Sequence, residues 1–160
     1  MHYTVCFLFG HNNHVLLQTK DRTDFKGKLN DVGGKFKLGE FPFDCAMREI
    51  KEETGAEPKA LVWLGDFHCP TNADEKYRLE ECHLHFFAGF VDPSHVSQQP
   101  GETEKLGWYN VQDILADPTN PQLAGDGDAW YFIYRGVQQL NIPIDLKTHV
   151  KLKESETERK

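Results

Sequence analysis

Short apolar runs separated by polar segments dominate the chain, and most of them have the composition of β-strands. They are rich in β-branched and aromatic residues, and the first two are separated by the turn-forming sequence GHNN, which predicts a hairpin or two adjacent strands. The predicted strands are 3–9, 14–19, 61–68, 82–91 and 106–109. The polar segments predicted to be loops are 21–30, 71–81, 92–104 and 120–128.

The segment 42–54 has the periodicity of an amphipathic helix instead. Its apolar residues are Phe43, Ala46, Met47 and Ile50, a spacing that places them on one side of a helix. Pro42 suits the first helical position and Gly55 suits the C-terminal stop. Residues 111–116 predict a short helix, and the aromatic-rich segment 129–140 predicts a longer, heavily packed one.

These elements predict one mixed α/β domain over residues 1–146, followed by a charged tail over 147–160 that we expect to be flexible. The net charge of −7 for 160 residues argues against general nucleic-acid binding, which favours a basic surface. No stretch approaches the roughly 20 apolar residues of a membrane span, and the N-terminus does not resemble a signal peptide.

The four cysteines, Cys6, Cys45, Cys69 and Cys82, are widely spaced. Such spacing indicates reduced thiols and a cytoplasmic location rather than a disulfide framework. His68, Cys69, His83 and His85 lack a metal-ligand spacing pattern, so the sequence does not predict a zinc site.

A cluster of three carboxylates, Glu49, Glu52 and Glu53, is the most informative feature of the predicted helix. Residues three and four apart share one face of a helix, where like charges repel and raise each other's pKa unless a cation neutralises them. Oxygen ligands suit Mg²⁺ or Mn²⁺, which usually bridge carboxylates to substrate phosphates. Arg48 can reach Glu52 one turn later, so we expect it to orient a carboxylate. The cluster taken alone is also compatible with a solvated acidic helix face.

The positions around this cluster favour the metal-binding interpretation. The segment from Gly34 to Ala56 reads G-x5-E-x7-R-E-I-x-E-E-x-G-A, which resembles the Nudix box at all of its fixed positions. The one departure is Ala56, which is smaller than the usual last aliphatic residue. The sequence therefore resembles the Nudix hydrolase family.

This resemblance implies an α/β/α sandwich with a mixed sheet, and hydrolysis of nucleoside diphosphates linked to another moiety. It implies that Mg²⁺ or Mn²⁺ is held by Glu49, Glu52, Glu53 and the carbonyl of Gly33. Glu40 and Arg48 would be supporting residues that fix the loop and the helix. Glu52 or Glu53 is the expected general base, and Glu102 or Glu104 is a weaker alternative, with Glu104 a further expected metal ligand.

The flanks of the box resemble the oxidised-purine nucleoside triphosphatases of the MutT-homologue group. The resemblance rests on an Asn three residues before a Gly-Gly-Lys and a Lys ten residues before that Asn. It also rests on an acidic pair before an aromatic helix, although Gly127 stands between the two acids here. The substrate-binding residues that it implies are Thr4, Lys20, Asn30, Asp126, Asp128 and Trp130. The plainer alternatives are a turn-stabilising Asn30, a solvated Lys20 and a core Trp130.

The leading hypothesis is a Mg²⁺-dependent nucleoside triphosphate pyrophosphohydrolase that releases a monophosphate and pyrophosphate, acting on oxidised purine nucleotides such as 8-oxo-dGTP. One alternative is hydrolysis of ADP-ribose, a dinucleotide or capped RNA. Another is a sensor that binds nucleotides without catalysis, against which the intact carboxylate cluster argues. The expected partner is a small nucleotide, with neither a membrane nor general nucleic-acid binding.

Overall fold

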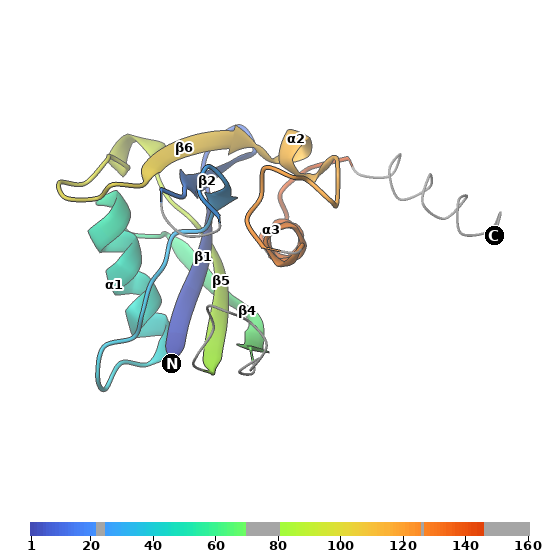
Figure 1. Cartoon of the computed structure of the whole chain (residues 1–160). Coiled ribbons are helices and arrows are strands. Elements are labelled where there is room, and N and C mark those ends of the chain that lie inside the picture. Colours follow the sequence, from blue (N-terminus) through green and yellow to red (C-terminus); the bar gives the residue numbers. More distant parts are fainter. Residues whose placement is uncertain (22–24, 70–80, 126, 146–160) are drawn as a thin grey trace.

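A mixed β-sheet with helices on both faces organises the chain (Figure 1). The computed structural model describes residues 1–21, 25–69, 81–125 and 127–145, without the side chain of Cys69. Most of the predicted loop 71–81, Asp126 and the tail 147–160 lie outside the described residues. In chain order the elements are β1 (His2–Phe9), β2 (His14–Thr19), β3 (Leu29–Asn30), α1 (Pro42–Thr54), β4 (Ala60–Cys69), β5 (Cys82–Phe90), the 3₁₀ helix η1 (Pro93–His95), β6 (Lys105–Asn110), α2 (Val111–Leu115) and α3 (Asp128–Gln139).

The strands follow the order β3-β2-β1-β5-β4, and β6 also pairs with β2. β1 is antiparallel to β2, as predicted for adjacent strands, but it runs parallel to β5 along its whole length. The two-residue β3 lies inside the predicted loop 21–30, where Asn30 pairs with Gln18. The loop prediction was therefore wrong for its last two residues, because two residues are too few to show the alternation of apolar and polar side chains that marks a strand.

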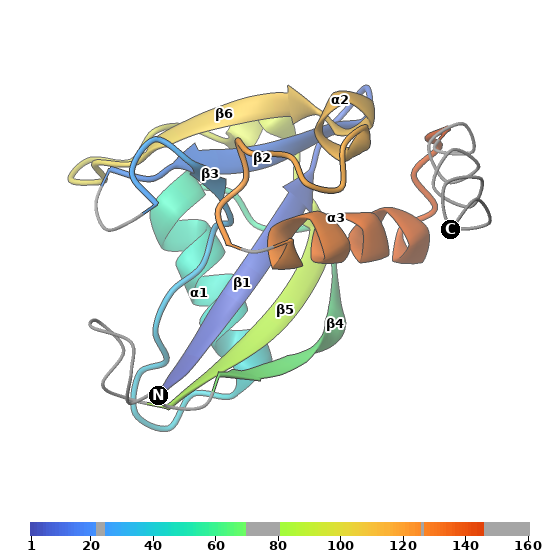
Figure 2. The same ribbon diagram turned by 45° about the vertical axis from the view of Figure 1, so that its right-hand side comes forward.

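Helices α1 and α3 lie on opposite faces of the sheet (Figure 2), which confirms the predicted α/β/α architecture. The sheet separates two apolar layers. Successive residues of a strand point to opposite faces. Cys6 and Leu8 of β1 therefore pack with Ala46 of α1, while Phe7 and Phe9 pack on the side of α3. Phe86 of β5 stacks on Phe132 of α3, with ring centroids 3.6 Å apart.

Helix α1 has the predicted bounds, because both of its ends are determined locally. Pro42 occupies the first turn, and Gly55 adopts a left-handed conformation with φ of 76° while its N–H donates to the carbonyl of Lys51. Ala46 and Ile50 are buried as predicted, but Phe43 is 50% exposed. The helix packs through Cys45 rather than Phe43, which contacts the ring of Phe87 only at its edge.

Two further properties concern the helices and the cysteines of the described residues. None of their helices combines the length and apolarity needed to cross a bilayer. Cys6, Cys45 and Cys82 are free thiols.

Candidate functional site

Arg48 connects the carboxylates of α1 to the loop that precedes the helix. Its guanidinium forms a two-bond pair with Glu40, with Nε–Oε1 at 2.5 Å and Nη2–Oε2 at 3.0 Å. Nη1 donates to both Glu49 at 2.7 Å and Glu52 at 2.9 Å, and Nη2 donates to the carbonyl of Lys35. The hydrogen bonds from Arg48, followed by the N–H of Lys37, lower the pKa of Glu40 to about 2. Through these contacts Arg48 and Glu40 tie the loop before α1 to the helix itself, which is the supporting role expected of them.

Glu53 lies apart from this cationic network. Its Oε2 atom accepts hydrogen bonds from the N–H of Gly33 at 2.9 Å and from the amide of Gln18 at 3.2 Å. Both donors are neutral, and in the described part of the chain no ion pair reaches Glu53. Burial raises its pKa to about 8, against the lowering effect of the Gly33 bond and with further repulsion from Asp31 and Glu49.

Two consecutive glycines explain how the carboxylates approach the backbone. A Cβ atom at Gly33, where φ is +154°, would lie 2.1 Å from the carbonyl oxygen of Thr4. A Cβ atom at Gly34 would lie 2.5 Å from the carboxyl carbon of Glu49. Both positions therefore need glycine if Glu49 and Glu53 are to pack against this segment.

The donor set fits a hard divalent cation. Burial raises the pKa of Glu49 despite its bond to Arg48, and Glu53 carries a larger rise without a cationic partner among the described residues. Such desolvated carboxylates are neutralised either by protons or by a cation. Glu49, Glu52 and Glu53 offer only oxygen ligands from one helix, which suits Mg²⁺ or Mn²⁺.

Lys20 follows β2 and Glu104 precedes the neighbouring strand β6, so the two residues lie side by side near this cluster. Their side chains form an ion pair with an Nζ–Oε2 distance of 3.1 Å. Burial lowers the pKa of Lys20, but the nearby carboxylates Asp31 and Glu104 outweigh it, so the net shift is upward. Glu102 lies in an exposed loop, and its charge contributes to the raised pKa of Glu53. The pairing with Lys20 places Glu104 beside the cleft rather than free in solvent.

A cleft of about 710 Å³ opens on the other side of the Gly33–Gly34 segment. Its polar lining includes Lys20, Asn30 and Asp128, three of the residues that the family resemblance implied would bind the substrate. Its wall includes the apolar and aromatic residues Tyr3, Val5, Phe25, Phe67, Leu84 and Phe86. The cleft therefore joins an aromatic wall to polar groups at the edge of the carboxylate cluster.

Two other predicted substrate residues have different surroundings. Thr4 borders the cleft, but its hydroxyl contacts the carbonyl of Gly34 and the thiol of Cys45 on the α1 side. Trp130 packs against the core, donates to the carbonyl of Leu115 at 3.2 Å and stacks on Tyr134. Its assignment to the cleft is not supported, because two residues along a helix rotate a side chain by roughly 200° away from Asp128.

Sequence reasoning missed Gln18 and Asp31. Gln18 is only 2% exposed and sits in the apolar run VLLQT, where a buried polar side chain is itself a sign of a specific partner. Asp31 lines the cleft, and burial raises its pKa to about 7 against the lowering effect of Lys20. Its position next to Asn30 was the available signal.

Comparisons with known proteins agree with this geometry. The sequence matches the family described as NUDIX domain over residues 2–130. An ADP-ribose pyrophosphatase of Methanocaldococcus jannaschii is 39% identical over 59 residues, which cover 37% of this chain and 35% of that protein. The chain thus matches only about a third of that curated relative's length.

Solved structures with the same fold include the MutT protein of Bacillus halodurans. It is 29% identical with a TM-score of 0.60, and the alignment covers 82% of this chain and 78% of that one. The NUDIX domain of Shewanella oneidensis NrtR, solved with ADP ribose, is 16% identical with a TM-score of 0.67 and 88% coverage of both chains.

Proposed function

We propose that this chain, which belongs to the Nudix family, is a Mg²⁺-dependent nucleoside triphosphate pyrophosphohydrolase acting on purine nucleotides, including oxidised ones such as 8-oxo-dGTP. The observation that carries the proposal is that the cleft and the carboxylate cluster of α1 meet at one short segment, residues 30–34. Asn30 and Asp128 line the cleft, and Gly33, three residues after Asn30, donates its N–H to Glu53. A base in the cleft would thus place its phosphates toward the carboxylates of α1.

The cleft has the groups that purine recognition needs. The amide of Asn30 offers both donors and an acceptor, so it can form two hydrogen bonds with a purine edge. Asp128 offers a carboxylate acceptor, and Phe67, which is 51% exposed, supplies aromatic surface for the base. The 29% identity to a MutT protein supports the resemblance to the MutT-homologue group on which this substrate class rests.

The proposed hydrolysis uses the carboxylates in different ways. Glu49, Glu52 and Glu53 would hold Mg²⁺, which when bound screens the phosphate charge and activates the attacking water. The N–H of Gly33 and the amide of Gln18 both hold Oε2 of Glu53, which leaves Oε1 to face the metal or to accept a proton from water. Arg48 keeps Glu49 and Glu52 in place, and Glu52 remains the second candidate for the general base.

A substrate screen tests this proposal. Purified protein with Mg²⁺ is incubated with dGTP, 8-oxo-dGTP, 2-oxo-dATP, dCTP and ADP-ribose, and the products are separated by ion-exchange chromatography. We expect the highest kcat/KM for a purine triphosphate, with a nucleoside monophosphate and pyrophosphate in equal amounts. Orthophosphate and a diphosphate as products, or dCTP as the best substrate, would contradict the proposal.

ADP-ribose hydrolysis is the second candidate, because a curated relative is an ADP-ribose pyrophosphatase and a structural relative was solved with ADP ribose. The same screen separates the two, since ADP-ribose would yield AMP and ribose 5-phosphate. Absence of turnover on every substrate, together with measurable nucleotide binding, would instead identify a sensor.

The free thiols of Cys6, Cys45 and Cys82 support a reducing compartment such as the cytoplasm.

A further inference from the structure

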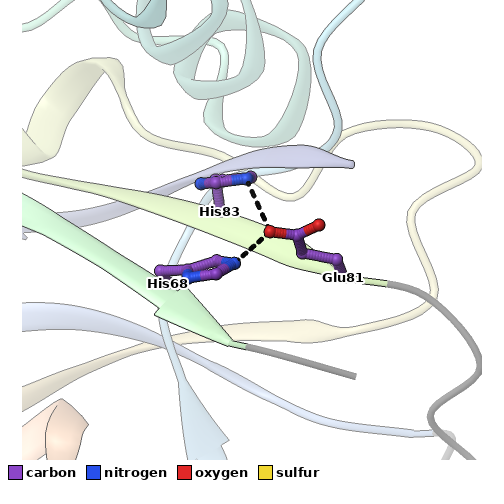
Figure 3. Close-up of side chains that lie close together, drawn as sticks. All are labelled: His68, Glu81 and His83. Atoms are coloured by element: carbon purple, nitrogen blue, oxygen red, sulfur yellow. Dashed lines mark hydrogen bonds and ion pairs between the residues drawn. The ribbon is translucent and has the colours of Figure 1, made fainter.

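A second group of side chains of metal-ligating types lies outside α1, where β4 ends and β5 begins (Figure 3). His68 of β4 pairs directly with His83 of β5 in the antiparallel register. Glu81 comes immediately before β5 and points between the two imidazoles. The side chains of His68, His83 and Glu81 are 51%, 38% and 55% exposed, so an ion can reach them from solvent.

The separations are close to those of a coordination sphere. Nε2 of His83 lies 3.6 Å from Oε1 of Glu81, and Nε2 of His68 hydrogen-bonds the same oxygen. One ligand atom from each residue lies within 4.8 Å of the other two. Two ligands bonded at about 2.1 Å to a tetrahedral zinc ion are about 3.4 Å apart. Small side-chain rotations would therefore convert the hydrogen-bonded group into a three-ligand site.

We propose that His68, Glu81 and His83 bind one divalent transition metal ion, with zinc as the preferred ion and water completing the coordination. The donor set of two imidazole nitrogens and one carboxylate oxygen suits zinc and its neighbours, whereas Mg²⁺ prefers oxygen ligands alone. This site is thus chemically different from the all-oxygen cluster of Glu49, Glu52 and Glu53. The spacing of His68 and His83 in the sequence did not predict this site, because the pairing of β4 with β5 brings the ligands together.

Neighbouring rings hold the two histidines in place. The ring of His83 stacks between those of His68 and His2, with centroid distances of 4.6 Å on each side. His2 contacts His85 through Nδ1 and Nε2 at 2.9 Å, and His85 is paired with Asp66 at 2.8 Å. These contacts restrict the rotation of the two imidazoles and so hold their ring nitrogens near Glu81.

The position of the site gives the bound ion a mechanical consequence. Side chains alternate between the two faces of a strand, so His68 and His83 lie on one face while Phe67 and Leu84 line the nucleotide cleft on the other. An ion that joins β4 to β5 would fix the strand ends that carry this wall. We therefore expect zinc to raise the melting temperature, because it binds only the folded arrangement.

Zinc titration of the reduced protein in excess Mg²⁺ tests the proposal. Isothermal titration calorimetry gives the stoichiometry, and ¹H–¹⁵N spectra of the imidazole rings identify the ligands. We expect the ring signals of His68 and His83 to shift with one equivalent of zinc while those of His11, in the first turn, do not. The affinity should fall at least about tenfold in His83→Ala and in Glu81→Gln.

Two variants serve as matched controls. His11→Ala removes an exposed histidine elsewhere, and Cys82→Ser removes the thiol between two proposed ligands. Both should bind zinc as the unmodified protein does. Zinc binding that leaves the rings of His68 and His83 unshifted, that survives in His83→Ala, or that is lost in Cys82→Ser would overturn the assignment, as would the absence of zinc binding.

Discussion

Replacing Glu53 by glutamine should make the metal-free protein more stable, and increasingly so as the pH rises. Burial raises the pKa of Glu53 from 4.5 in the unfolded chain to about 8 in the fold. The folded protein thus holds this proton more tightly than the unfolded chain does. The contribution of Glu53 to stability is therefore most favourable below pH 4.5, and it is lost as the pH rises toward 8. Glutamine is neutral throughout this range and can still accept the hydrogen bonds from Gly33 and Gln18.

The magnitude follows from the shift in pKa. One unit corresponds to about 1.4 kcal/mol, so a fully ionised Glu53 costs the metal-free fold at most about 5 kcal/mol above pH 8. Local relaxation and water reduce this limit, and we expect a gain of about 2 kcal/mol for Glu53→Gln at pH 8 and less than about 1 kcal/mol at pH 5. For a chain of this size, 2 kcal/mol corresponds to roughly 4–8 °C in melting temperature.

The assay is urea unfolding with excess chelator at several pH values between 5 and 8.5, for the unmodified protein, Glu53→Gln and Glu52→Gln. Glu52 is the matched control, because it stands on the same helix with a side chain that is 49% exposed. Added Mg²⁺ should reverse the order at pH 8, since it binds the folded unmodified protein most tightly. A pH-independent difference, or a Glu53→Gln protein that is less stable at pH 8 in chelator, would refute the reasoning and make Glu53 a structural residue.

Three further outcomes are expected. Hydrolysis should require Mg²⁺ or Mn²⁺, stop in chelator and be nearly lost in Glu53→Gln, as measured by pyrophosphate release; turnover in chelator would contradict the metal assignment. Asn30→Ala should lower kcat/KM for the best purine substrate by a factor that corresponds to about 1–3 kcal/mol, and should change kcat/KM for a poor pyrimidine substrate little. Equal losses for both substrates would mean that Asn30 only shapes the segment. Arg48→Lys should lower the free energy of unfolding by about 2 kcal/mol, because lysine cannot form the paired bonds to Glu40; an unchanged denaturation midpoint would contradict this.

Helix α1 could be predicted to the residue because its limits are set by neighbours in the sequence. Pro42 begins it, Gly55 ends it, and the i+3 and i+4 spacing of the carboxylates is a local property. Its docking against the sheet depends on contacts with distant strands. For this reason the exposure of Phe43 and the burial of Cys45 could not be obtained from periodicity alone.

The cleft was predictable only in part, for the same physical reason. Asn30 and Asp128 were assigned to one substrate site through a family resemblance, since nothing local links two residues so far apart. The contribution of Gln18 depends on the pairing of β2 with β3, and β3 was too short to predict. Trp130 packs against the core, which was the plainer alternative for it. The sequence could not decide between the two, because an aromatic residue after an acidic one does not reveal which side of the helix faces the cleft.

The segment from Asn30 to Gly34 connects the two chemical tasks of the proposed enzyme. Asn30 and Asp31 line the cleft, Gly33 donates to Glu53, and Gly34 leaves room for the carboxylate of Glu49. The backbone here has little freedom, because any side chain at Gly33 would collide with the carbonyl of Thr4. Under the proposed function, a base held by Asn30 would be at a fixed separation from the carboxylates of α1. Discrimination between bases and positioning of the scissile phosphate would then depend on the same few backbone atoms, so an ill-fitting base would also misplace its phosphates.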